Sequence, residues 1–112
     1  MDIDVMELGG GMAVVKLQGK LNMVSARSFR DSVVEAVAAG HVRLAIDLSG
    51  VDFIDSSGLG ALISGLKTTR QAGGDLRIAS PNEQVRLVLQ LTNMDRLLSA
   101  YDDAKSAFAD GS

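Results

Sequence analysis

Two adjacent serines between an aspartate and a glycine are the residues of this 112-residue sequence whose types and spacing best suit chemistry. They lie in the stretch Asp55-Ser56-Ser57-Gly58-Leu59-Gly60, after which apolar residues recur at Leu62, Ile63 and Leu66. The three- and four-residue spacing from Leu59 onward predicts that this stretch forms the first turn of a helix. Backbone N–H groups are unpaired there and the helix dipole is positive, so a negative charge is tolerated. A phosphorylated serine would fit this position.

The same stretch also has a purely structural interpretation. Ser56 or Ser57 could act only as the N-cap of the helix, while Gly58 and Gly60 let the helix lie close to a sheet. A capping box would place Glu or Gln three residues after the cap, where this chain has Leu59 or Gly60. Glycine costs about 1 kcal/mol relative to alanine inside a helix, so two glycines in one turn indicate a further requirement for small residues.

The expected outward face of this helix is small and uncharged for two turns. We place on it Ser57, Gly60, Ala61 and Ser64, and charge returns only at Lys67 and Arg70. Exposed helix faces usually carry more charge than this. We interpret the face as a surface that another protein covers. A phosphate beside it would disfavour binding of that protein.

Enzymatic patterns are weak in this sequence. His41 is the only histidine, and the serines do not lie in the G-x-S-x-G motif of hydrolases, so a Ser-His-Asp site is not indicated. The run Gly9-Gly10-Gly11 lacks the Lys-Ser/Thr of a P-loop, and Gly58-x-Gly60 lacks the third glycine of a dinucleotide fingerprint. We expect no catalytic residue and no cofactor.

Three aspartates near the serines could in principle gather around Mg²⁺. They are Asp47, Asp52 and Asp55, at and after the end of a predicted strand. We interpret Asp52 instead as a turn residue and Asp47 as a partner for neighbouring backbone N–H groups. We therefore expect no metal ion.

Composition limits the class of protein. The length suits one domain, over 1–112, with its own hydrophobic core, and the absence of cysteine excludes disulfides and thiolate catalysis. No apolar run approaches the roughly 18 residues that span a bilayer, and the first residues lack the basic start of a signal peptide. We expect a cytoplasmic protein without membrane contact. The net charge of −3 and the aromatic content of 4% argue against nucleic-acid binding.

The hydrophobic periodicity predicts a hairpin followed by alternating helices and strands. We expect strands over 3–8, 12–18, 42–48, 76–79 and 97–101, and helices over 25–39, 55–72, 81–91 and 102–109, with a solvated tail at 109–112. Ser49-Gly50 is expected to end the third strand, and Ser80-Pro81 to supply the cap and first residue of the third helix. That helix should pack through Val85, Leu87, Val88 and Leu91. The fold class is α/β.

The stretch from Leu44 to Leu62, LAIDLSGVDFIDSSGLGAL, closely resembles the signature of the STAS-class anti-sigma factor antagonists of bacteria. Leu17-Gln18-Gly19-Lys20-Leu21-Asn22 resembles the second strand and following loop of that family. Ala79-Ser80-Pro81 and Val85-Arg86-Leu87-Val88-Leu89 resemble its third helix, so the resemblance covers nearly the whole chain. It implies a STAS-type fold, a mixed β-sheet with an N-terminal hairpin packed against α-helices.

The resemblance also implies a partner-switching function. In the family, the serine corresponding to Ser56 is phosphorylated by an anti-sigma factor that is also a GHKL-type serine kinase, and a PP2C-type phosphatase removes the phosphate. The unphosphorylated antagonist binds the kinase and releases its sigma factor, without being an enzyme itself. We expect the partner-binding residues to be Asn22, Asp55, Ser57, Gly58, Gly60, Ala61 and Ser64.

One departure from the family pattern concerns the loop after the second strand. Many members have Gly-Glu-Leu-Asp or Gly-Arg-Leu-Asp where this chain has Gly19-Lys20-Leu21-Asn22. Asn22 keeps the hydrogen-bonding shape of the aspartate but loses its charge, which bears on partner affinity or type. Some relatives use the same switch to control secretion, biofilm formation or signalling enzymes, so the output could differ from a sigma factor. The sequence also leaves open a receiver-like aspartyl phospho-acceptor and a static scaffold that never carries phosphate.

Overall fold

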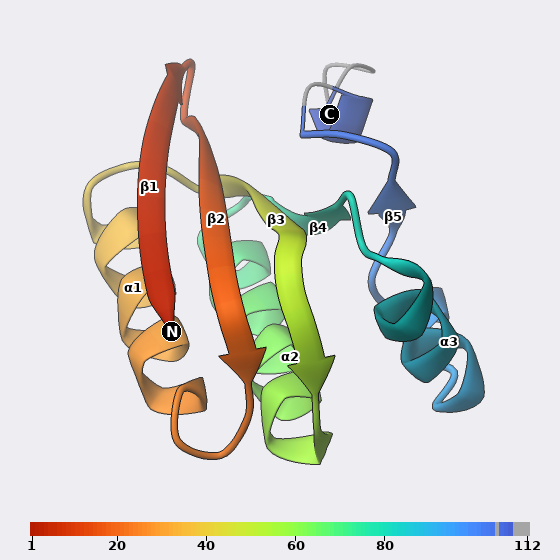
Figure 1. Ribbon diagram of the computed structural model, residues 1–112. Coiled ribbons are helices and arrows are strands. Elements are labelled where there is room, and N and C mark those ends of the chain that lie inside the picture. Colours follow the sequence, from red (N-terminus) through yellow and green to blue (C-terminus); the bar gives the residue numbers. More distant parts are fainter. Residues whose placement is uncertain (105, 109–112) are drawn as a thin grey trace.

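The computed structural model describes residues 1–104 and 106–108, which form a mixed sheet with helices packed against it (Figure 1). The strands are β1 (Asp2–Gly9), β2 (Met12–Leu21), β3 (Arg43–Ile54), β4 (Asp75–Ala79) and β5 (Ala100–Tyr101). The helices are α1 (Ala26–Ala38), α2 (Ser56–Gln71) and α3 (Glu83–Leu91), with two short 3-10 helices, η1 (Met94–Arg96) and η2 (Ser106–Phe108). The predicted order of elements up to β5 is confirmed.

The strands follow one another across the sheet in chain order. β1 pairs antiparallel with β2, and β2 to β5 pair in parallel. The β1–β2 turn uses three consecutive glycines with φ angles of 82°, 62° and 79°, a region that side chains rarely adopt. The predicted N-terminal hairpin and mixed sheet are therefore confirmed. A receiver-like domain would have strand order 2-1-3-4-5, so the receiver-like interpretation is wrong.

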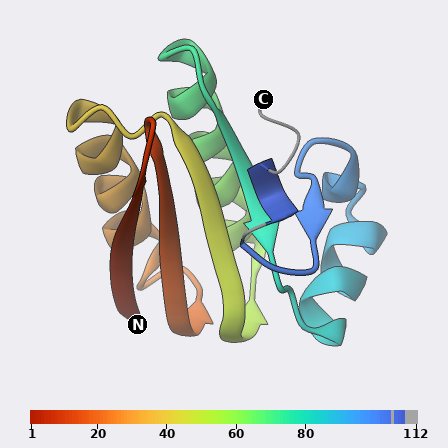
Figure 2. The ribbon, with the colours of Figure 1, turned by 90° about the horizontal axis from the view of Figure 1, so that it is seen from above.

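Helices α1 and α2 lie side by side against one face of the sheet, and α3 lies beyond its β4–β5 end (Figure 2). Their apolar faces bury Phe29 and Val33 of α1 and Leu62 and Leu66 of α2 against strand residues such as Ile46. This burial is what fixes both helices to the sheet. Within the described part of the chain, no helix has the length and apolar character needed to cross a membrane.

The other face of the sheet is partly covered by the C-terminal segment. Ala45 is buried with Ala107 and Phe108 of η2 in a second apolar cluster. Arg77 of β4 holds this segment, because its guanidinium lies 4.5 Å from the Phe108 ring centroid and donates a 2.7 Å hydrogen bond to the Ala107 carbonyl. Instead of a terminal helix over 102–109, the described residues form only the short η2, and the predicted tail at 109–112 lies outside them.

The predicted ends of the second and third strands are wrong, and the fifth strand is shorter than predicted, because it covers only Ala100–Tyr101 and not 97–101. β2 continues through Gly19 to Leu21, and β3 continues through Ser49 and Gly50 to Ile54, with register shifts between the two strands. Gly50 does not break the strand. A Cβ atom there would lie 3.0 Å from the Leu17 carbonyl oxygen, so the close approach of β2 requires glycine at this position.

The predicted start and packing of the third helix also need correction. Asn82, not Ser80, is the N-cap, and its side chain accepts a 2.8 Å hydrogen bond from the Val85 amide. Ser80 has a φ of 53° and donates from its hydroxyl to the Asp102 carbonyl. Of the residues expected to pack α3, Val85 is buried, whereas Leu87 and Leu91 are exposed. Leu89 is buried in their place.

Candidate functional site

Ser56 is the first residue of α2 and lies just after the end of β3. Its side chain is exposed, and within the described chain its hydroxyl has no hydrogen-bond partner. The residue that caps α2 is Asp55, whose Oδ1 accepts a 2.9 Å hydrogen bond from the Gly58 amide. The interpretation of Ser56 or Ser57 as the N-cap is therefore wrong. Because Asp55 does the capping, the Ser56 hydroxyl is available for other chemistry.

Asp55 also joins α2 to the loop at residues 22–25. Its Oδ2 accepts a 3.3 Å hydrogen bond from the Met23 amide, and its own amide donates to the Leu21 carbonyl at 3.3 Å. One carboxylate thus fixes both the first turn of α2 and the loop that follows β2. This contact places Asn22, the last residue of the Leu17–Asn22 segment that resembles the family's second strand and following loop, close to Ser56 in the fold.

Asn22 organises the 22–25 loop from within. Its Oδ1 accepts hydrogen bonds from the amides of Val24, at 3.0 Å, and Ser25, at 3.2 Å. The Ser25 hydroxyl accepts from the Asn22 amide at 3.0 Å and donates to the Lys20 carbonyl at 2.6 Å. An aspartate at position 22 could accept the same two bonds, so Asn22 preserves the shape of the loop and removes one negative charge near Ser56.

The two glycines of the first turn serve different purposes. Gly58 is buried, and a Cβ atom there would lie 2.2 Å from the Leu21 carbonyl oxygen, so glycine permits close packing of α2 on the end of β2. Gly60 is exposed, and a Cβ atom there would meet nothing within 4 Å. The expectation that both glycines serve close packing is therefore correct only for Gly58.

A groove runs along α2 from Ser56 toward its C-terminal half. Its volume is about 470 Å³, and its lining consists of Ser56, Leu59, Gly60, Ile63, Ser64, Lys67, Thr92 and Met94. Gly60 and Ser64 of the expected smooth face therefore line a concave surface that begins at the candidate phosphorylation site. Ser57 and Gly58 do not line it. Ala61 was expected to face outward and is instead fully buried in the core.

Three large apolar side chains are exposed in the two segments that lead to Asp55, the 22–25 loop and the end of β3. Met23 and Val24, in the loop bonded to Asp55, are 74% and 84% exposed, and Phe53, near the end of β3, is 41% exposed. Exposed apolar side chains on segments next to a candidate site favour a surface for another protein. Sequence reasoning missed all three, although two consecutive large apolar residues in a short turn were a usable signal.

The aspartates considered for Mg²⁺ do not form a site. Asp47 accepts a 2.9 Å hydrogen bond from the Ser49 amide, as predicted, and Asp52 is exposed within β3 rather than in a turn. No group of three or more possible metal-ligating side chains is present among residues 1–104 and 106–108. His41 lies elsewhere, 2.9 Å from the Glu7 carboxylate.

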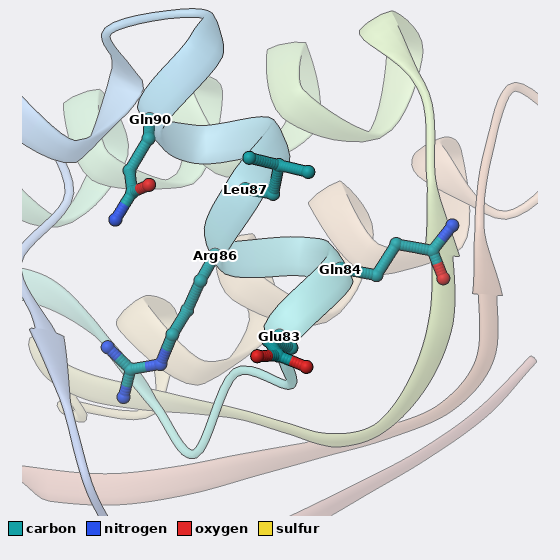
Figure 3. Close-up of a pocket in the computed structure, with 5 residues that line it drawn as sticks. All are labelled: Glu83, Gln84, Arg86, Leu87 and Gln90. Carbon is teal, nitrogen blue, oxygen red and sulfur yellow. The ribbon is translucent and has the colours of Figure 1, made fainter.

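A second hollow, of about 560 Å³, lies on the exposed face of α3. It is lined by residues of this helix alone: Glu83, Gln84, Arg86, Leu87 and Gln90. Figure 3 shows that these side chains fan out from the helix, with Gln84 pointing away from Arg86 and Gln90. Because no two polar groups converge on a common point, this hollow is a weaker candidate than the groove at Ser56.

Comparison with known proteins identifies the family of this chain. The family model of the STAS domain matches residues 5–107. A Thermotoga maritima protein described as a candidate anti-sigma factor antagonist is 38% identical over 89 residues, which cover 79% of each chain. The crystal structure of a Thermotoga maritima protein with the same description superimposes with a TM-score of 0.86 at 30% identity, over 96% of this chain and 92% of that one.

More distant relatives carry the same description. The anti-sigma F factor antagonist of Paenibacillus polymyxa is 26% identical over 106 residues, which cover 94% of this chain and 91% of the relative. The unphosphorylated form of the anti-sigma factor antagonist SpoIIAA shares the fold, with a TM-score of 0.82 at 16% identity over 98% and 96% of the two chains. The chain belongs to the STAS domain family, and its similarity within that family includes bacterial anti-sigma factor antagonists.

Proposed function

We propose that this protein is an anti-sigma factor antagonist controlled by phosphorylation of Ser56. In its unphosphorylated form it binds an anti-sigma factor that is also a GHKL-type serine kinase, and so releases the sigma factor. Phosphorylation of Ser56 ends this binding, and a PP2C-type phosphatase restores it. The protein acts in the cytoplasm as a ligand and kinase substrate, and this role requires no catalysis, cofactor or metal ion of its own.

The position of Ser56 carries this proposal. The side chain is exposed, its hydroxyl has no bond to the described residues, and it stands at the start of a groove. A kinase can therefore reach the hydroxyl without first breaking a structural hydrogen bond. Ser57 lacks this combination, because it is partly buried and does not line the groove. The related fold of SpoIIAA has been solved in both an unphosphorylated and a phosphorylated form.

The surface around Ser56 is suited to a protein partner. The groove along α2 has a largely apolar lining from Leu59, Ile63 and Met94, with Lys67 as its only charged residue. The loop that carries the exposed side chains of Met23 and Val24 is hydrogen-bonded to Asp55, the residue before Ser56. An interface with an apolar centre and few charges is typical of stable protein association. Asp55 and Asn22 contribute by holding the two halves of this surface in place.

A phosphate on Ser56 would change this surface without unfolding it. It adds about −1.5 to −2 charges at the N-terminus of α2, where the helix dipole favours negative charge. The same charge would have to be desolvated under a partner that covers the apolar groove, and that desolvation disfavours binding. The proposed switch therefore acts on the interface and not on the fold.

The test is phosphorylation by a purified GHKL-type serine kinase from the source organism. The wild-type protein, a Ser56→Ala variant and a Ser57→Ala variant are incubated with the kinase and Mg-ATP, and the modified residue is mapped by fragmentation. We expect acid-stable phosphate on Ser56 in the wild type and in Ser57→Ala, and none in Ser56→Ala. Modification of Ser56→Ala at Ser57 to the wild-type extent, or acid-labile phosphate, would overturn the assignment. Co-purification of the sigma factor with the kinase, and its release by this protein, tests the output.

A further inference from the structure

β1 is an outer strand of the sheet, and one of its two edges is unpaired. It pairs only with β2, and no other described strand lies beside it (Figure 1). On alternate residues, the backbone N–H and C=O groups that point away from β2 therefore have no strand partner in the described chain. The edge is also regular, because six consecutive register pairs run from Asp2↔Gln18 to Glu7↔Ala13 without a bulge. An edge of this kind is a template for one further strand.

Exposed apolar side chains lie on both faces of β1. Ile3 packs against the core cluster that contains Phe29 of α1, so the odd-numbered residues face the helices and the even-numbered residues face the open side of the sheet. Val5, on the helix side, is 47% exposed, and Met6 and Leu8, on the open side, are 64% and 47% exposed. Edge strands are often protected by lysine, proline or a bulge, and residues 2–7 have none of these. Apolar residues on both faces are instead typical of a strand inside a sheet.

Two hollows flank β1 that the rest of the described chain does not fill. On the open side, a hollow of about 610 Å³ has Met6, Leu8 and Val14 in its lining. On the helix side, a hollow of about 210 Å³ is lined by Val5 and by small residues of α1 such as Ser32. The helix therefore leaves Val5 partly uncovered, and side chains of an added strand can pack on both faces of the edge.

The acidic residues of β1 restrict which strand can occupy the edge. They are Asp2, Asp4 and Glu7, and a strand with carboxylates at the facing positions would be repelled. In an antiparallel pair related by a two-fold axis, the open faces of both sheets stay on one side, so only residues of the same face oppose each other. An axis at Asp4 or Glu7 sets a carboxylate against its own copy, and an axis at Ile3 sets Asp2 against Asp4. These registers are therefore disfavoured.

The strand is complementary to a second copy of itself in two other registers, with the axis at Val5 or at Met6. Both registers keep every carboxylate opposite an uncharged residue along the strand. With the axis at Val5, however, Met6 and Leu8 would each oppose an aspartate of the second copy. With the axis at Met6, this side chain opposes its own copy, and Val14, its register partner on β2, extends the apolar row into each sheet. The register centred on Met6 therefore brings the most exposed apolar side chain of the strand into apolar contact.

We propose that two copies of this chain associate through the free edge of β1, in the antiparallel register that places Met6 opposite Met6 of the second copy. Backbone hydrogen bonds between the two β1 strands join the sheets into one continuous sheet. None of the residues that line the groove along α2 belongs to β1, so this dimer leaves the groove free. The proposal is independent of the function assigned to Ser56.

Neighbouring side chains of the same copy reduce the repulsion between the two acidic strands. In the proposed register, Asp4 opposes Leu8 of the second copy, and its register partner on β2 is the cationic Lys16. The Glu7 carboxylate lies 2.9 Å from Nε2 of His41. Two of the three carboxylates of each strand thus have a neighbour in their own copy that stabilises negative charge.

Sedimentation equilibrium of the full chain, from micromolar to millimolar concentration, tests the association. We expect a reversible equilibrium between monomer and dimer. Met6→Lys sets two ammonium groups against each other at the axis, so the dissociation constant of the dimer should rise at least tenfold. Leu91→Lys makes the same change at a 74% exposed residue of α3, and this matched control should dimerise as the wild type does. Thermal melts check that both variants are folded.

Single cysteine substitutions test the register, because the sequence contains no cysteine. Directly opposite residues of an antiparallel pair have Cα atoms about 4.5–5.5 Å apart, within the range that a disulfide spans. Under mild oxidation, we expect Met6→Cys to form disulfide-linked dimers faster than Val5→Cys or Leu8→Cys, since neither of those positions opposes its own copy.

Three results would contradict the proposal. A chain that stays monomeric at millimolar concentration would overturn it, and would leave a strand of another protein as the occupant of the edge. A dimer that Met6→Lys leaves intact, or that Leu91→Lys weakens equally, would overturn it by placing the contact on another surface. Faster cross-linking of Val5→Cys than of Met6→Cys would overturn the proposed register.

Discussion

The amide of Met23 donates a 3.3 Å hydrogen bond to Oδ2 of Asp55, 32 residues later in the chain. The other oxygen of the same carboxylate caps α2 through the Gly58 amide. The loop at residues 22–25 and the first turn of α2 are consequently held by one side chain. The surface on both sides of Ser56 is therefore formed in the free protein, before any partner binds.

Removal of the Asp55 carboxylate should destabilise the protein. We expect Asp55→Ala to lower the free energy of unfolding by about 1–2 kcal/mol, the typical effect of losing an N-cap. Asp55→Asn should have a smaller effect, because its side-chain oxygen can still accept from Gly58. Urea unfolding measures both, and Asp52→Ala, at an exposed position of β3, is the control. Equal stability of Asp55→Ala and Asp52→Ala would show that the cap contributes nothing.

The two glycines in the first turn of α2 should respond to alanine with opposite signs. Gly58→Ala places a methyl group 2.2 Å from the Leu21 carbonyl oxygen, and we expect this overpacking to cost about 1–3 kcal/mol of stability. Gly60→Ala meets no atom within 4 Å and should stabilise the protein by up to about 1 kcal/mol through helix propensity. Thermal and urea unfolding of the pair provide the measurement. A Gly58→Ala variant as stable as Gly60→Ala would contradict the close packing of α2 on β2.

The elements that were predicted correctly from the sequence are those whose apolar periodicity lies within the element itself. The hairpin glycines, the helix with Phe29 and Val33, and the parallel strand with Leu44 and Ile46 are where the pattern indicated. The errors have non-local causes. Gly50 was interpreted as a strand end because its requirement for glycine comes from Leu17, on the neighbouring strand.

The residues of the candidate site also divide into those that a local sequence pattern indicates and those whose position depends on distant parts of the chain. Ser56 and Asp55 were found from the motif, and Gly60 and Ser64 from the uncharged helix face. Thr92 and Met94, which form the opposite wall of the groove, belong to a segment whose position depends on how α3 packs. No local pattern in the sequence relates them to α2, so the groove could be recognised only in the structure. Ala61 was misplaced because a small apolar residue suits either a surface or a tightly packed core.

Long charged side chains in the groove along α2 should weaken partner binding. Gly60→Arg and Ser64→Arg each place a guanidinium on the proposed apolar contact surface, and we expect at least tenfold weaker binding of the kinase, about 1.4 kcal/mol. Gly60→Ala is the matched control, because it changes the same position while adding only a methyl group and no charge. Binding is measured by calorimetric titration, together with thermal melts that confirm the fold. Wild-type affinity in both arginine variants would show that the groove is not part of the interface.

The phosphorylation mimic Ser56→Asp tests whether phosphorylation prevents partner binding by changing the interface or by unfolding the protein. An aspartate at the first position of α2 is favoured by the helix dipole, and the Ser56 hydroxyl that it replaces makes no hydrogen bond to the described residues. We therefore expect the melting temperature to change little. Binding of the kinase should weaken at least tenfold, because a second carboxylate beside Asp55 must be desolvated or face acidic groups under the partner.

Both quantities should be measured on one preparation, by thermal melt and by calorimetric titration, with Ser56→Ala as the uncharged control. Ser56→Ala should bind the kinase nearly as well as the wild type does, because it adds neither charge nor bulk to the groove. Comparable losses in both variants would mean that the hydroxyl itself is a binding contact. If Ser56→Asp lost binding only together with a large fall in melting temperature, the switch would act through local unfolding. Phosphorylation would then disrupt the surface formed by the 22–25 loop, Asp55 and the groove along α2, instead of only blocking partner binding to it.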